Sequence, residues 1–113
     1  MKDDAILLDL MLDAFAKIRD FISEMTYKDF LADSKTQSAA IMQLQVVGEL
    51  AKRVSDATRE KIDIPWKQMA GMRDFVAHNY FSLDIEVVWR TISESARNVE
   101  EKVRAYVDRN NNS

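Results

Sequence analysis

The stretch Gly71-Met-Arg-Asp-Phe-Val-Ala-His-Asn-Tyr-Phe81 holds the only histidine of the chain and one of its two glycines. Four residues separate Arg73 from His78, and one residue separates His78 from Tyr80. No other segment gathers so many groups that can bind phosphate or move a proton. We call this stretch the central motif, and the interpretation of fold and function depends on it.

Apolar residues on both sides of the central motif recur at the three- and four-residue spacings of amphipathic helices. This periodicity predicts three long helices, over residues 4–26, 35–57 and 84–108. Polar residues that can cap a helix precede the second and third of them, with Asp33 or Ser34 before the second and Ser82 or Asp84 before the third.

The connections between these helices predict shorter ones. Pro65 is suited to the start of a short helix, where its missing N–H costs nothing. Gly71 is expected to end that helix and to begin the one that carries the central motif. With two glycines and one proline, the chain has little turn chemistry for a many-stranded sheet. The sequence therefore predicts an all-α fold, an antiparallel helical bundle with three long helices and one or two short ones.

The length of 113 residues predicts one domain, which we place at residues 1–109, followed by a disordered polar tail at 110–113. Gly48 lies inside the second predicted helix, where glycine costs roughly 1 kcal/mol relative to alanine. Close packing against another helix is the favoured reason, and a binding role is the alternative. Trp66 and Trp89 are interpreted as core anchors rather than as platforms for stacked bases.

Composition excludes several classes of site. The chain has no cysteine and one histidine, so neither a disulfide nor a zinc site is expected, and we predict no metal or other cofactor. No apolar run approaches the length that spans a bilayer. The segment 1–5 carries acids where a signal peptide carries basic residues, which favours a cytoplasmic location.

Charge gives a mixed indication about nucleic acids. The net charge of −3 argues against general coating of nucleic acid, which relies on many basic side chains. Residues 52–73 are nevertheless locally basic, with six Lys or Arg against three Asp or Glu. This excess of positive charge comes directly before and into the central motif.

Helical geometry sets how the motif side chains can combine. Asp74 and His78 are four residues apart and share a face, so the carboxylate could orient the imidazole. Arg73 and Tyr80 also share a face. Arg73 and His78 are five residues apart, about 140° around the axis. Either the helix unwinds near His78, or a second copy of the chain completes the site in a symmetric dimer.

The chemistry suits such a composite site. Histidine can exchange a proton near neutral pH, and arginine binds phosphate and stabilises charge that develops on it. Together they suffice in principle for metal-free RNA cleavage, with the ribose 2′-OH as nucleophile. The alternative, which composition alone favours, is structural. Arg73 and Asp74 would then be surface charges, His78 a partly buried residue near a helix end, and Tyr80 a packed ring with a solvated hydroxyl.

The motif and its flanks resemble the HEPN superfamily, and within it the HepT-like toxins of toxin–antitoxin modules of the HepT/MntA type. The family signature is Arg, four residues, His, one residue, Tyr, with a polar residue commonly after the Arg. Three flanking segments of this sequence also resemble the family, at residues 47–52, 64–66 and 84–89. The similarity covers about residues 4–105.

The resemblance implies a homodimeric, metal-independent ribonuclease toxin that acts on RNA and pairs with a small nucleotidyltransferase antitoxin. His78 would be the general acid/base and Arg73 the phosphate clamp, with Asp74 or Asn79 orienting the histidine. The antitoxin would transfer AMP to Tyr80 and so silence the toxin. The alternative is a non-catalytic helical subunit, nucleotide-binding or scaffolding, whose role is to bind the nucleotidyltransferase.

Overall fold

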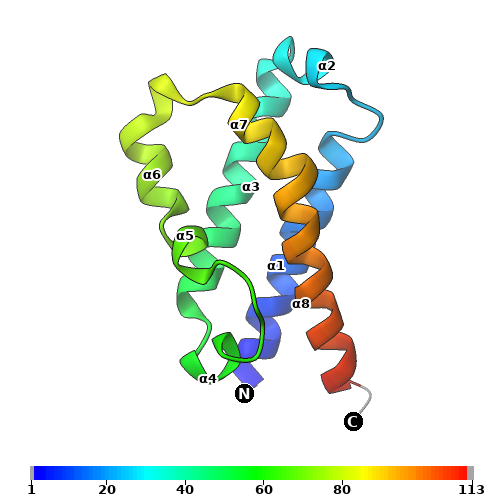
Figure 1. The fold of residues 1–113 in the computed structure, drawn as a ribbon, viewed down its shortest axis with the longest axis vertical. Helices are drawn as coiled ribbons and strands as arrows, with labels where there is room; N and C mark the ends of the chain where they lie inside the picture. Colours follow the sequence, from blue (N-terminus) through cyan, green and yellow to red (C-terminus); the bar gives the residue numbers. More distant parts are fainter. Residues whose placement is uncertain (1, 112–113) are drawn as a thin grey trace.

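Three long helices form an antiparallel bundle in the structure, a computed structural model that describes residues 2–111 (Figure 1). They are α1 (Lys2–Phe21), α3 (Ser34–Arg53) and a continuous helix made of α7 (Ile85–Arg90), the π-helical turn η2 (Thr91–Ser95) and α8 (Ala96–Asn111). Helix α1 packs against both α3 and α8. The predicted all-α bundle with three long helices is confirmed.

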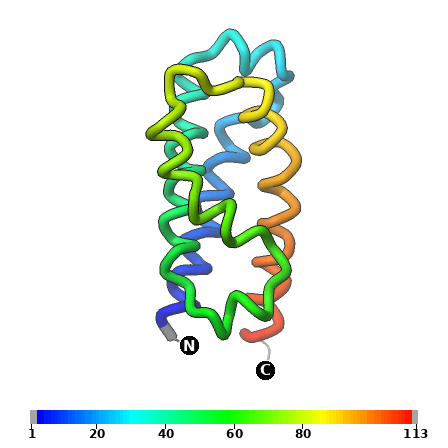
Figure 2. Tube along the Cα trace, turned by 60° about the vertical axis from the view of Figure 1, so that its left-hand side comes forward, coloured from blue at the N-terminus to red at the C-terminus, as the bar shows by residue number. Residues whose placement is uncertain are grey.

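Two short helices carry the chain back along α3 toward the start of α7. They are α5 (Trp66–Ala70) and α6 (Met72–Asn79), and both contact α3 (Figure 2). Pro65 is the N-cap residue of α5, and Gly71 ends α5 and precedes α6, as the sequence predicts. A 3-10 turn, η1 (Tyr80–Ser82), follows α6, and Asp84 caps α7 by accepting a hydrogen bond from the N–H of Glu86.

The first long helix is shorter than predicted. It ends at Phe21 rather than at residue 26, and the chain then turns through Glu24, whose φ of 63° lies in the left-handed region. Thr26 starts a new helix, α2 (Tyr27–Leu31), through a reciprocal capping box with Asp29. The apolar spacing continued past the true end because Ile22 and Met25 still face the core from the turn.

The second long helix ends at Arg53 rather than at residue 57. Val54 has an extended backbone, and Ser55 caps a further short helix, α4 (Asp56–Arg59), where the sequence predicted that the second long helix continues to residue 57. Together α2 and α4 add two short helices to the two that the central region predicts. At the starts of α2 and α4, a capping side chain begins a new helix while the apolar periodicity of the sequence still continues.

The last helix extends further than predicted. Helix α8 continues through Asn111, so residues 110 and 111 of the expected disordered tail are helical. The side-chain amide of Asn110 donates to the carbonyl of Tyr106, which satisfies one of the last backbone acceptors of the helix. Residues 112–113 lie outside the described residues.

The core fills the space between the long helices. Its most deeply buried large side chains come from α1, α2, η2 and α8: Leu8, Met11, Ile18, Phe30, Ile92 and Val103. Both tryptophans pack against this core, as predicted. The Trp66 indole N–H donates to the Ile62 carbonyl at 2.9 Å, and the Trp89 ring lies 5.2 Å from that of Phe30. No helix within residues 2–111 is long and apolar enough to cross a membrane.

Gly48 lies where α3 meets α5, as the close-packing interpretation predicts. A Cβ atom at this position would collide with the backbone carbonyl oxygen of Met69 and would lie 3.3 Å from the Cβ of Met72. A backbone oxygen cannot rotate away as the end of a flexible side chain can. The absence of a side chain at Gly48 is therefore what lets α5 approach α3.

A buried carboxylate joins the start of α1 to the start of α4. Asp4 is 4% exposed and accepts hydrogen bonds from the backbone N–H and hydroxyl of Ser55, at 3.0 and 2.5 Å, and from the hydroxyl of Thr58 at 2.6 Å. Burial by itself raises the pKa of Asp4, but the hydrogen bonds outweigh it and hold the pKa below its usual value of 3.8. The ionised carboxylate thus stabilises the folded chain.

We expect Asp4→Ala to lower the free energy of unfolding by about 1–3 kcal/mol at pH 7, because Ser55 and Thr58 lose a buried acceptor. The pKa of Asp4 is lower in the folded chain than in the unfolded one. The stabilisation is therefore present above the unfolded pKa and is lost as the pH falls through the folded pKa. Thermal unfolding of both proteins between pH 7 and pH 3 measures this difference, with the exposed Asp13→Ala as control. A difference between wild type and Asp4→Ala as large at pH 3 as at pH 7 would contradict the linkage.

Candidate functional site

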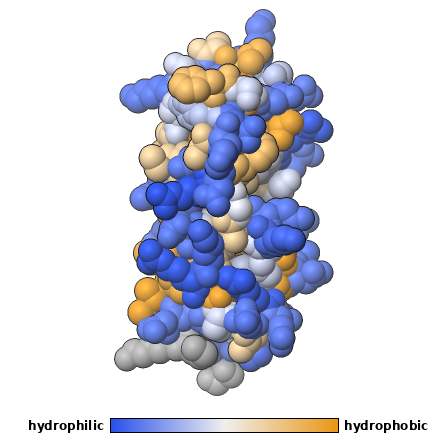
Figure 3. Space-filling view, turned by 90° about the vertical axis from the view of Figure 1, so that its left-hand side faces the viewer, coloured by the Kyte–Doolittle hydropathy of each residue, from blue (hydrophilic) through white to orange (hydrophobic). Residues whose placement is uncertain are grey.

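The central motif forms α6 and η1 on the outside of the bundle, over α3. Its inner side is apolar, with Val76 buried and Met72 packed against the core. Its outer side exposes Arg73, Asp74 and His78 to solvent. Figure 3 shows the face of the molecule on this side, where hydrophilic side chains dominate the middle and hydrophobic ones reach the surface near the upper end.

The guanidinium of Arg73 forms an ion pair with a carboxylate of α3. Its Nη1 lies 3.7 Å from Oε2 of Glu49, and Glu49 also pairs with Arg53 at 3.5 Å. Oε2 of Glu49 is buried and accepts no hydrogen bond from any described residue. The Arg73 side chain remains 65% exposed. The guanidinium thus lies within ion-pair distance of α3, and most of the side chain is open to solvent.

The pairing of Glu49 with Arg73 is not predicted by the sequence. The two residues are distant in sequence and come together only because α6 packs against α3. The available signal was local: Glu49 follows Gly48, and it stands one helical turn before Arg53. That pattern predicts an acid–arginine pair on α3 but says nothing about Arg73.

His78 is oriented by the backbone of its own helix. Its Nδ1 lies 2.9 Å from the carbonyl oxygen of Asp74. Because a carbonyl can only accept, Nδ1 carries the hydrogen and donates it, and this leaves Nε2 on the exposed side of the ring free to accept a proton. The carboxylate of Asp74 makes no hydrogen bond or ion pair with the imidazole in the part of the chain that the structure describes. The backbone of Asp74, rather than the expected carboxylate, orients the ring.

The other two motif residues point elsewhere. The amide of Asn79 donates to the Phe75 carbonyl at 2.8 Å and does not reach His78. Tyr80 lies in η1, with its ring about half exposed and packed edge-on against that of Phe81 at a centroid distance of 5.5 Å. The Tyr80 hydroxyl has no hydrogen-bond partner among the described residues. It is therefore open to a reagent from solvent.

Helix α6 keeps Arg73 and His78 apart within one chain. It is regular from Met72 to Asn79, and the backbone departs from helical geometry only at Asn79, where φ is −121° and ψ is 14°. The unwinding that the sequence considered near His78 thus comes after His78. It does not turn the imidazole toward Arg73. The backbone of α6 therefore does not by itself bring Arg73 and His78 to one phosphate.

The all-α bundle displays Arg73 and His78 on the exposed helix α6 and Tyr80 in the turn η1 that follows, and this fold and motif place the chain in the HEPN superfamily. The chain belongs to the ribonuclease HepT-like family, whose model matches residues 11–106.

Named relatives agree with this assignment. The chain is 38% identical over 96 residues to "Probable ribonuclease HepT" of Thermococcus cleftensis, which covers 84% of this chain and 87% of the relative. It is 37% identical over 98 residues to "Putative RNase MJ0127" of Methanocaldococcus jannaschii, with coverages of 86% and 81%. No solved structure matches this chain.

Proposed function

We propose that this protein is a metal-independent endoribonuclease toxin that acts as a homodimer. The observation that supports this proposal most directly is the geometry of α6, which exposes Arg73 and His78 on a regular helix and turns them away from each other. A two-fold axis beside α6 would place Arg73 of one copy near His78 of the other. Membership of a family described by ribonuclease activity gives the class of substrate.

The proposed reaction is an internal transfer within RNA. The ribose 2′-oxygen attacks the neighbouring phosphorus, and the bond from phosphorus to the 5′-oxygen of the next nucleotide breaks. Nε2 of His78 takes the proton of the 2′-hydroxyl, and protonated His78 returns a proton to the departing 5′-oxygen. Arg73 stabilises the negative charge that builds on the phosphoryl oxygens. The products carry a 2′,3′-cyclic phosphate and a free 5′-hydroxyl.

Glu49 fits this scheme as a positioning residue. Its carboxylate lies 3.7 Å from the Arg73 guanidinium on the side of α3 and attracts it toward the bundle. The same carboxylate pairs with Arg53, which extends the local positive surface toward the motif. Asp74 and Asn79 support His78 indirectly in this scheme, through the helix backbone that they form.

We further propose that a nucleotidyltransferase antitoxin silences the protein at Tyr80. The phenol oxygen would attack the α-phosphorus of ATP, lose its proton and release pyrophosphate, which leaves AMP bound to the tyrosine. The half-exposed ring and unpartnered hydroxyl of Tyr80 make the attack sterically possible. The attached phosphate would add negative charge beside the Arg–His site and repel RNA.

Tyr80→Phe should escape this modification and stay active in the presence of the antitoxin and ATP. The change removes one solvated hydroxyl and keeps the ring contact with Phe81, so folding should be unaffected. Mass spectrometry of the intact protein, with and without the antitoxin, measures the addition. Tyr27→Phe is a matched control, since Tyr27 is also exposed but lies in α2. An AMP adduct on Tyr80→Phe would show that another residue is the acceptor.

Cleavage of diverse RNAs by the purified protein in excess EDTA tests the main proposal. We expect cleavage to persist and its products to end in 2′,3′-cyclic phosphate. Cleavage that stops in EDTA would contradict the metal-independent mechanism. An inert protein whose Tyr80 carries no modification would instead favour a non-catalytic subunit that binds a nucleotidyltransferase.

A further inference from the structure

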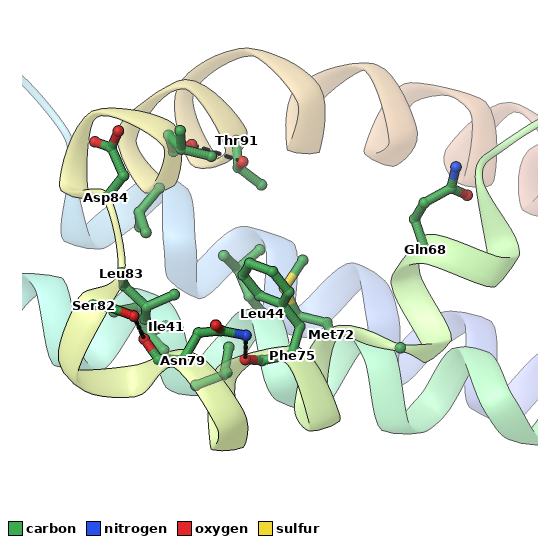
Figure 4. Close-up of a pocket in the computed structure, with 14 residues that line it drawn as sticks. Ile41, Leu44, Gln68, Met72, Phe75, Asn79, Ser82, Leu83, Asp84 and Thr91 are labelled. Carbon is green, nitrogen blue, oxygen red and sulfur yellow. Dashed lines mark hydrogen bonds between the residues drawn. The ribbon is translucent and has the colours of Figure 1, made fainter.

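An apolar groove of about 560 Å³ runs beside the candidate site, between α6 and α7, with α3 as its floor (Figure 4). Ile41 and Leu44 form the floor, Met72 and Phe75 the wall on α6, and Val87 and Val88 the wall on α7. Figure 4 shows Phe75 and Met72 reaching from α6 toward Leu44 across this space. Asn79, Ser82 and Asp84 supply polar groups at the end near η1.

Large apolar side chains are exposed at the rim of this groove and directly after α6. Phe81 is fully exposed, and Phe75, Tyr80 and Val87 are 57%, 49% and 48% exposed. The three aromatic fractions together equal roughly two whole side chains, on the order of 300–500 Å² of apolar surface. An apolar area of that size is comparable to the largest apolar patch of a typical monomer, and such patches are often functional surfaces.

That area suits one half of a protein dimer. A stable interface buries roughly 800 Å² on each partner, with an apolar centre and a polar rim. The exposed aromatic surface would supply about half of this, and the motif side chains around it would supply the rim. RNA is a poorer occupant, because the lining is mostly apolar and the carboxylate of Asp84, which lines the groove, repels phosphate.

We infer that a second copy of this chain covers the groove and that its Phe81 side chain fills it. The inference rests on the proposed homodimer and assigns the contact that holds it. In η1 the Phe81 ring touches the ring of Tyr80, yet the side chain remains fully exposed, so it is free to enter a partner. The groove has ample volume, since a cavity of about 150 Å³ accepts a benzene ring.

The contact is reciprocal. Phe81 lies in the chain between Asn79 and Ser82, which both line the groove, so a two-fold axis between two copies can place each Phe81 in the other copy's groove. Phe75, which lines the groove, lies about one helical turn before His78 in the sequence. The two side chains project from neighbouring sides of α6. Filling of the groove would therefore bring the partner chain alongside His78, where the proposed composite site needs it.

Cross-linking between two cysteine variants tests the placement. The natural chain has no cysteine, so each introduced thiol is unique. Ser82→Cys places a thiol beside Phe81, and Val87→Cys places one on the groove wall. When the two variants are mixed and treated with a short bismaleimide, we expect a covalent dimer in higher yield than from either variant alone. In the matched control, Ile6→Cys takes the place of Val87→Cys. Ile6 is exposed on α1, and we expect little covalent dimer from this pair.

Adding Phe81→Ala to the Ser82→Cys chain should abolish that cross-link. Measured by sedimentation, Phe81→Ala alone should raise the dissociation constant of the dimer at least tenfold. Truncation of a residue at the centre of an interface has an effect of this order. Leu31→Ala removes another exposed apolar side chain, 53% exposed and located on α2, and should leave the dimer unchanged. Both side chains are exposed, so neither change should alter thermal unfolding of the monomer.

The outcomes separate this inference from the proposed activity, because none of these measurements uses RNA. A dimer that Phe81→Ala leaves intact, or equal cross-linking of the Ile6→Cys control, would overturn the inference and leave the composite site standing. A monomeric wild-type protein would also overturn it. A dimer that dissociates on Phe81→Ala but cleaves no RNA would support the inference and refute the activity.

Discussion

Replacing His78 with alanine is expected to lower the rate of RNA cleavage by about 10²–10⁴-fold, the usual contribution of one general acid–base group. Replacing Arg73 with alanine is expected to cost about 10²–10³-fold, since it removes a donor aimed at developing phosphate charge. Both side chains are exposed, so neither change should alter folding. Single-turnover cleavage of one RNA, beside thermal unfolding of each variant, measures these effects. The control is Lys67→Ala, which removes a basic side chain of α5 outside the motif.

Mixing the two inactive variants distinguishes a site shared between chains from one within a chain. If Arg73 of one copy acts with His78 of the other, a mixed dimer contains one intact site out of two. Random exchange makes about half of the dimers mixed, so about a quarter of the wild-type sites should return. Failure to recover any activity, with exchange of subunits verified, would place the whole site within one chain and contradict the composite arrangement.

Gly48→Ala is expected to destabilise the folded chain by about 1–3 kcal/mol, although alanine is ordinarily the better helix former. The added methyl group would meet the Met69 carbonyl oxygen, which belongs to the backbone of α5 and can move only with that helix. The melting temperature should fall by roughly 4–8 °C for each kcal/mol. Displacement of α5 and α6 should also weaken the contact between Glu49 and Arg73 and lower RNA cleavage.

Gly71→Ala is the matched control for this prediction. Gly71 has a φ of −82°, which any residue adopts, and a Cβ there would lie in ordinary contact, 3.5 Å from the Lys67 carbonyl oxygen. The change should leave the melting temperature nearly unchanged. Equal destabilisation by both alanines would show that glycine at these positions matters for reasons other than the approach of α5 to α3.

The sequence predicted the helices well where the determining contacts are local. Pro65, Gly71 and Asp84 begin or end helices through their own backbone or side-chain chemistry, and the structure places them there. The errors arose at helix ends, and one of them is that α8 continues past residue 108 to Asn111. At Phe21 and at Arg53 the apolar spacing runs on while the backbone turns, because the following residues reach the core from a turn or from a new helix.

The candidate site also has some features that the local sequence predicts and others that it does not. The exposed Arg73 and His78 on one short helix, and the angle between them, follow from their spacing and from helical geometry. The hydrogen bond from His78 to the Asp74 carbonyl is also local, but the sequence pointed to the carboxylate. Side-chain orientation within one helical turn depends on rotamers, and residue spacing does not determine these.

By itself, the sequence determined the all-α class, the three long helices and the residues of the motif, because helical periodicity and capping act over three or four residues. Only the tertiary structure decided that Glu49 pairs with Arg73 and that Asp4 accepts hydrogen bonds from Ser55 and Thr58. It also decided that an apolar groove opens between α6 and α7. These contacts join residues on different helices. They depend on how closely and at what angle the helices pack, which the side chains of both partners determine together.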